Sequence, residues 1–182
     1  MASTLTVDNI VGATTAANVK LPAGCILQTV QTAKTDTFTA GQNTAFADIT
    51  GLSVSITPAS ASNKILVTYN VNVGGPNGGY RAFIHLMRGS TDIYRGADSN
   101  SRTRCSNFIY TRNDSVGHIA AYMATGTHLD SPNTTSATTY KLQITTHNSG
   151  GNVYYVNTAA SNNSNSSGQN PISQITVMEV AA

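Results

Sequence analysis

The chain has 182 residues with 10 Lys and Arg against 8 Asp and Glu, and its 26 Thr, 18 Ser and 18 Asn make up a third of it. One Glu and four Lys are too few for a coiled coil or helical bundle, and a net charge of +2 excludes charge-driven disorder and favours neither nucleic acid nor a membrane as partner. No apolar run reaches the roughly 18 residues that a membrane-spanning helix needs.

Residues 1–24 differ from the rest of the chain. They contain only two short apolar runs, which cannot form a core alone, so we expect an extended N-terminal arm that docks on another protein. The first residues lack the basic and apolar regions of a signal peptide, which predicts assembly in a cytoplasm. The expected docking side chains are the apolar ones of the two runs: Leu5, Val7, Ile10, Val11, Val19 and Leu21.

Residues 25–182 alternate apolar and polar side chains with the period of β-strands. The clearest case is Lys64–Val73, in which five apolar residues share one face. No segment has a strong helical period, so we predict an all-β head domain, an antiparallel β-sandwich or jelly roll. The other predicted strands are Cys25–Thr32, Leu52–Ile56, Tyr80–Arg88, Ser106–Arg112, Ser115–Thr125, Thr139–His147, Asn152–Thr158 and Ile172–Val180.

Three of these strands, Tyr80–Arg88, Ser115–Thr125 and Ile172–Val180, are apolar on both faces. Such a pattern predicts burial on both sides, either in the middle of the sandwich or at a subunit interface. The glycine-rich segment 74–79 predicts a hairpin turn. The polar segment 159–171 predicts a surface loop before the last strand.

All six arginines fall between Arg81 and Arg112, with Asp92, Asp98 and Asp114 interleaved. Two interpretations stay open: solvated loops with local ion pairs, or a contact surface for a neighbouring subunit or an anionic glycan. Loops on a rigid sandwich are the expected place for host contact, because Asn, Ser and Arg side chains match sugar hydroxyls and carboxylates. The candidate contact residues are Arg95, Arg102, Arg104, Asn162 and Asn165.

The sequence carries no catalytic or metal-binding motif. Neither a nucleophile elbow nor a phosphate-binding loop occurs, and the four histidines and two cysteines lack ligand spacing. We therefore predict no catalytic residue, no cofactor and no metal site within one chain. We expect Cys25 and Cys105 to be two part-buried free thiols, with a single bridge between them as the alternative. Two possibilities stay open. A trimer could bind a metal ion with three copies of one His on its axis, and two of the seven Asp could form the carboxylate pair of a glycan-cleaving enzyme.

The order of several segments resembles a known group of proteins. The first segments are STLTVDNIVG (Ser3–Gly12) and NVKLPAG (Asn18–Gly24), and an ILQTVQT strand comes next. After it come DITGLSVSITPASASNKILV (Asp48–Val67) and, near the end, SQITVMEV (Ser173–Val180). In this order they resemble small tail-fibre-like or minor structural proteins of tailed bacteriophages, of the kind frequent in marine and cyanobacterial phages. The resemblance implies a virion component, usually a homotrimer, with an N-terminal attachment segment and a trimeric jelly-roll head of the tumour-necrosis-factor type. It carries over no active-site residue.

The expected function is that of a non-enzymatic, trimeric phage fibre or tip protein. Its partners would be two further copies of itself, other virion proteins bound through the arm, and a glycan of the host surface. A three-fold interface would also cover the strands that are apolar on both faces. Two alternatives stay open: a capsid decoration or head-fibre protein, and a small glycan-active enzyme.

Overall fold

The computed structural model describes residues 21–40, 45–75, 81–111, 120–146, 153–159 and 168–182. Within these ranges the chain forms strands and no helix, so no described segment is a helix that could span a membrane. The strands are β1 (Ile26–Lys34), β2 (Phe38–Ala40), β3 (Ala47–Ile56), β4 (Lys64–Gly74), β5 (Arg81–Arg88), β6 (Thr91–Tyr94), β7 (Asn107–Tyr110), β8 (Ala121–Asp130), β9 (Thr138–Thr146), β10 (Tyr154–Val156) and β11 (Ser173–Val180).

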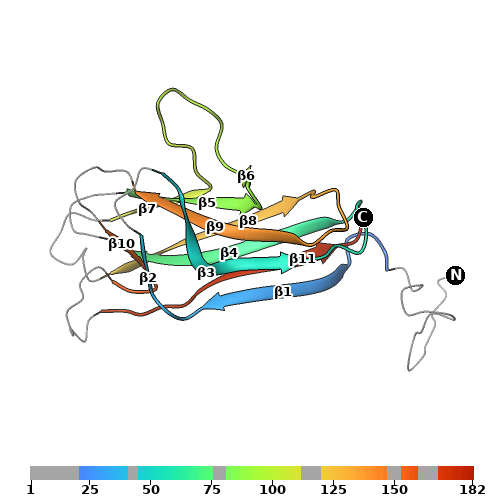
Figure 1. Ribbon diagram of the computed structural model, residues 1–182, viewed down its shortest axis with the longest axis horizontal. Helices are drawn as coiled ribbons and strands as arrows, with labels where there is room; N and C mark the ends of the chain where they lie inside the picture. The colour runs from blue at the N-terminus through green and yellow to red at the C-terminus, as the bar shows by residue number, and fades with distance from the viewer. Residues whose placement is uncertain (1–20, 41–44, 76–80, 112–119, 147–152, 160–167) are drawn as a thin grey trace, which may run out of the picture.

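The strands form two antiparallel sheets that pack face to face (Figure 1). In the first sheet, here called sheet A, the long strands lie in the order β1-β11-β4-β8, with β10 and β2 continuing beside the end of β4. In the second, sheet B, the order is β3-β9-β5, with β6 and β7 on the far side of β5. Without the short strands β2, β6 and β10, the orders β1-β11-β4-β8 and β3-β9-β5-β7 are those of a jelly roll. The predicted all-β sandwich is confirmed.

The core lies between the sheets and follows the predicted alternation. The five apolar residues of β4 from Ile65 to Val73 are buried and face Ile84 and Leu142 of sheet B within one apolar cluster. Each aliphatic side chain among them stabilises the fold by about 1.5–3 kcal/mol relative to leaving it in water. The β4 strand therefore forms the centre of the domain, paired on both sides.

One sequence prediction on this scaffold is wrong, and another has the wrong limits. The glycine-rich segment 74–79 does not join two neighbouring strands as a hairpin, because β4 ends at Gly74 in sheet A and β5 begins at Arg81 in sheet B. The strand predicted at Ser115–Thr125 is β8, which runs on to Asp130, and Met123 on its outer face is 60% exposed. Residues 112–119 lie outside the described part of the chain. The outer face of β8 is open in a single chain, so its burial at a subunit interface stays a prediction, whereas the outer face of β5 is buried as predicted.

Gly74 is required because of a close approach between backbones. A Cβ at this position would lie 2.3 Å from the carbonyl oxygen of Thr158 and 2.8 Å from Cα of Ala159. We expect Gly74→Ala to lower the free energy of unfolding by about 2–3 kcal/mol, since backbone must move to make room. Gly96→Ala is the matched control, because no atom lies within 4 Å of the added Cβ. Equal urea midpoints for the two variants would contradict this prediction.

The head has two distinct ends. At one end, the Gly24 amide donates to Ala181 O (2.8 Å) and the Ala181 amide donates to Cys25 O (2.9 Å), so the root of the arm lies beside the C-terminus (Figure 1). At the opposite end, β4 finishes at Gly74 and β5 begins at Arg81. Residues 1–20 of the arm lie outside the described residues. The boundary between arm and head at residue 24 stays a prediction.

Candidate functional site

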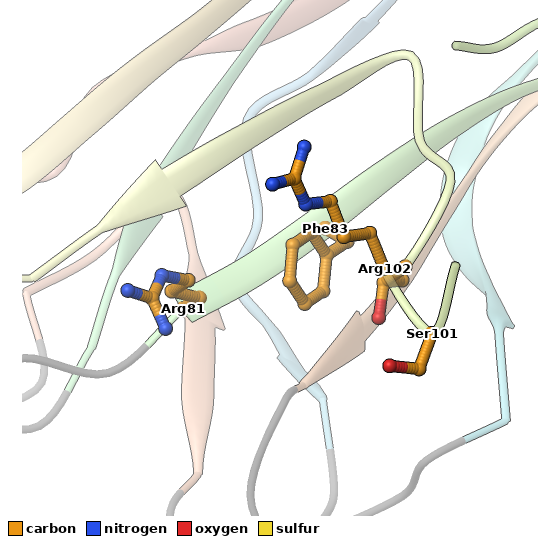
Figure 2. A pocket seen from close by; sticks show the side chains of 5 residues that line it. Arg81, Phe83, Ser101 and Arg102 are labelled. Carbon is orange, nitrogen blue, oxygen red and sulfur yellow. The ribbon is translucent and has the colours of Figure 1, made fainter. Parts of the chain in front are cut away.

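A pocket of about 460 Å³ lies on the outer face of sheet B. Side chains alternate along a strand, so β5 directs Ala82 and Ile84 into the core and Arg81, Phe83 and His85 to the outer face. The long connection between β6 and β7 crosses this outer face, and its residues 101–103 form the second wall of the pocket. In Figure 2 the ring of Phe83 lies between the side chains of Arg81 and Arg102, with the Ser101 hydroxyl nearby. The lining residues are Arg81, Phe83, Ser101, Arg102 and Thr103.

Aromatic side chains continue the pocket along β7. Register pairing places Tyr110 beside Arg81 and Phe108 beside Phe83. The Arg81 guanidinium lies over the Tyr110 ring, 5.4 Å from its centroid, which is a cation–π contact. Phe108 and Tyr110 are 54% and 47% exposed, so the pocket opens onto an apolar, aromatic surface.

The arginines of this region differ in their partners. Arg88 binds Asp130 at 2.8 Å, and Arg95 lies 3.2 Å from Asp92. Neither Arg81 nor Arg102 has a carboxylate within ion-pair distance among the described residues. The guanidiniums of Arg81 and Arg102 at the pocket thus carry a charge that no described carboxylate neutralises, and the same holds for Arg104, whose Nε donates to Gly96 O.

The segment 95–106 that walls the pocket is fixed to β5 by hydrogen bonds. His85 Nε2 donates to Arg104 O (2.6 Å), and the Ser106 amide donates to Ile84 O (2.8 Å). The His85 ring also stacks on Phe46 and lies 3.3 Å from the Asp92 carboxylate. Within the segment, Arg104 Nε donates to Gly96 O (2.9 Å). The wall is thus held in place before any ligand arrives.

The predicted contact residues have different positions in the structure. Arg102 lines the pocket, whereas Arg95 pairs with Asp92 and Arg104 binds the backbone of its own loop. Asn162 and Asn165 lie outside the described residues. The candidate contact residues did not include Arg81 and Phe83, because the candidates were taken from loops and both of these belong to a strand, although Arg81 lies in the arginine-rich window. The sequence signal that could have identified Arg81 is that it is a charged residue at the start of β5, a strand whose next six residues are buried.

The predicted docking residues are almost all outside the described part of the chain. Leu5, Val7, Ile10, Val11 and Val19 fall within residues 1–20. Leu21 is the one that the structure describes, and it is 50% exposed at the root of the arm. Its role in docking stays a prediction.

The cysteines and the remaining titratable groups form no reactive constellation among the described residues. Cys25 and Cys105 are free, half-buried thiols, as predicted, and burial raises the pKa of Cys105. No group of three His, Cys, Asp or Glu side chains within the described ranges is arranged to hold a metal ion.

No protein-family model and no curated protein matches the chain. Among solved structures it is similar to a chain of infectious bursal disease virus, Gx strain, with 13% identity and a TM-score of 0.39 over 85% of this chain and 36% of that one. A chain of the Gt strain has 14% identity and a TM-score of 0.39, with 85% of this chain and 38% of that one covered. A chain of the VP2 subviral particle of the same virus has 14% identity and a TM-score of 0.35, with 85% of this chain and 37% of that one covered. The chain thus spans little more than a third of the chains it matches.

Proposed function

We propose that this chain is a non-enzymatic structural protein of a bacteriophage particle. It is a homotrimeric fibre or tip protein that attaches to the virion through residues 1–24 and contacts the host surface with its jelly-roll head. The observation that carries this proposal is that the two ends of the head differ. The root of the arm and the C-terminus lie at one end, and the pocket with its two available arginines lies toward the other. An attachment protein needs such a separation between its anchor and its contact site.

The outer face of sheet A supports self-association. In three successive rows across β8, β4, β11 and β1, no side chain is charged. Leu129 and Met123 at its edge are exposed, and an uncharged, partly apolar sheet face is a typical contact between subunits. The pocket lies on the opposite sheet and would stay open in a trimer. The rows are Leu129–Leu66–Met178–Thr29, Thr127–Thr68–Thr176–Gln31 and Thr125–Asn70–Gln174–Ala33.

Light scattering tests the trimer. We expect the purified chain to have three times its 19.0 kDa mass at micromolar concentration. Thr127→Lys, which places a charge on the proposed interface of each subunit, should weaken association at least tenfold. Thr50→Lys, exposed on β3 of the other sheet, should leave the mass unchanged. A stable mass of 19.0 kDa for the unaltered chain would overturn the homotrimer.

Electron microscopy of intact particles tests attachment through the arm. Particles assembled with the full chain should show the head, and particles assembled with an Ile10→Asp, Val11→Asp chain should lack it, because two charges would be forced into an apolar contact. Density at the tail supports the fibre or tip protein, whereas density on the capsid surface supports the decoration or head-fibre protein instead. Retention of the variant would place the docking residues elsewhere.

A further inference from the structure

The charge of the pocket between β5 and the segment 95–106 selects its ligand. Arg81 and Arg102 flank one cavity and have no carboxylate partner among the described residues. A guanidinium presents a planar fork of N–H donors that matches a carboxylate in a bidentate manner. The arrangement therefore favours a ligand with planar anionic groups.

The aromatic surface adds a second requirement. Phe83, which is 9% exposed, lies at the bottom of the pocket between the arginines, and Phe108 and Tyr110 of β7 provide the exposed aromatic surface beside it. Flat rings of this kind suit a ligand with an apolar face, such as the C–H face of a pyranose, while the Ser101 and Thr103 hydroxyls at the rim suit ring hydroxyl groups. A small inorganic anion would use the arginines but not this surface.

The number of positive charges argues against nucleic acid. A nucleic-acid site follows a backbone with one phosphate per nucleotide and needs a continuous basic track. Here the nearby arginines Arg88 and Arg95 are each paired with an aspartate, and Arg104 is bonded to the backbone of its own loop. Two available guanidiniums beside an aromatic surface match one or two acidic sugar residues better.

We propose that this pocket binds a carboxylated saccharide, such as a uronic acid residue of a surface glycan, with its carboxylate between Arg81 and Arg102 and its sugar ring on the exposed Phe108 beside Phe83. This inference rests on the proposed host contact and names its ligand class. Because the segment 95–106 is already fixed by the hydrogen bond from His85 to Arg104, little ordering opposes binding.

Titration calorimetry with the full chain and trigalacturonate as probe tests the proposal. The methyl ester of trigalacturonate is the matched ligand, since it keeps the sugar rings and removes the charge. We expect saturable binding of the acid and at least tenfold weaker binding of the ester. Arg81→Gln and Arg102→Gln should each weaken binding of the acid about tenfold, whereas Lys64→Gln, which removes the same charge at the arm end of the head, should change it less than twofold.

Four results would overturn the inference: no binding of the acid, equal binding of acid and ester, an equal loss in Lys64→Gln, or tighter binding of a single-stranded DNA oligonucleotide that the same two substitutions remove. Urea unfolding of each variant confirms that the fold is kept. Particle assembly and trimer mass are separate readouts. If they behave as expected while trigalacturonate does not bind, the ligand class is wrong and the structural role stands.

Discussion

Replacing Asp130 by alanine is expected to lower the free energy of unfolding by about 3 kcal/mol. Asp130 lies at the end of β8 in sheet A and accepts hydrogen bonds from two residues of sheet B. Arg88 Nη1 lies 2.8 Å from each of its carboxylate oxygens, and the Tyr140 hydroxyl donates to Oδ2 at 2.7 Å. Removing the carboxylate leaves the Tyr140 hydroxyl unpaired and leaves the Arg88 guanidinium with its longer bond to Ser131 O (3.2 Å) and no counter-charge. The cost of breaking a buried ion pair is about 3–5 kcal/mol, and we expect the lower value because the Arg88 side chain is 28% exposed.

The Tyr140 hydroxyl supplies the control for this cluster. Tyr140 is fully buried, and burial together with the bond to Asp130 raises its pKa, so it stays a donor at every pH at which the protein is handled. Tyr140→Phe removes one hydrogen bond and keeps the ring, so we expect a loss of about 1 kcal/mol. Urea unfolding measures both variants. An Asp130→Ala chain no less stable than Tyr140→Phe would show that the ion pair between the sheets contributes nothing.

Glu179→Gln is expected to lower the free energy of unfolding by about 2 kcal/mol at pH 7, because bonds to a charged acceptor become bonds to a neutral one. Glu179 on β11 is completely buried. It accepts hydrogen bonds from Asn63 Nδ2 (2.6 Å), the Ala59 amide (2.7 Å) and Gln28 Nε2 (2.5 Å). One carboxylate thus joins β1, the β3–β4 connection and the last strand.

The same carboxylate predicts how stability depends on pH. Burial alone would raise the pKa of Glu179, but the hydrogen bonds from Asn63, Gln28 and the backbone of Ala59 and Ser60 outweigh it and hold the pKa below its ordinary value. On acidification the unfolded chain takes up the proton first. The stabilisation is therefore fully present above the unfolded pKa of about 4.3 and is lost as the pH falls through the lower folded pKa.

Urea unfolding between pH 7 and pH 3 measures this effect. The unaltered chain should lose stability below about pH 4.5, and Glu179→Gln should show a shallower loss over that window. Asp48→Asn is the control, because Asp48 is largely exposed and its pairing with Lys141 is worth about 1 kcal/mol at most. An acid profile of Glu179→Gln that parallels that of the unaltered chain would contradict the assignment.

The sequence predicted the long strands because their side chains alternate with a period of two, as in Lys64–Val73 and Thr139–His147. It missed β2 and β6, which have three and four residues and show no period at that length. The limits of β8 were wrong because Gly126 interrupts its alternation, and this glycine is needed where a Cβ would lie 2.5 Å from the Tyr69 ring.

The candidate site was predicted only in part for a different reason. Arg102 was found because arginine in a polar loop is conspicuous. Arg81 and Phe83 meet it only through the folding of segment 95–106 over β5, a contact between residues about 20 positions apart that no local pattern encodes.

The pairing of the first and last strands has a mechanical consequence. β1 runs antiparallel to β11 over eight paired positions, and the arm leaves from its first residues, beside Ala181. Tension applied to the arm therefore pulls β1 lengthwise, so its ladder of hydrogen bonds is strained in shear and must yield together. A strand pulled sideways would instead open one bond at a time. We expect the head to resist a pull through its own anchor far better than a pull across the sheet.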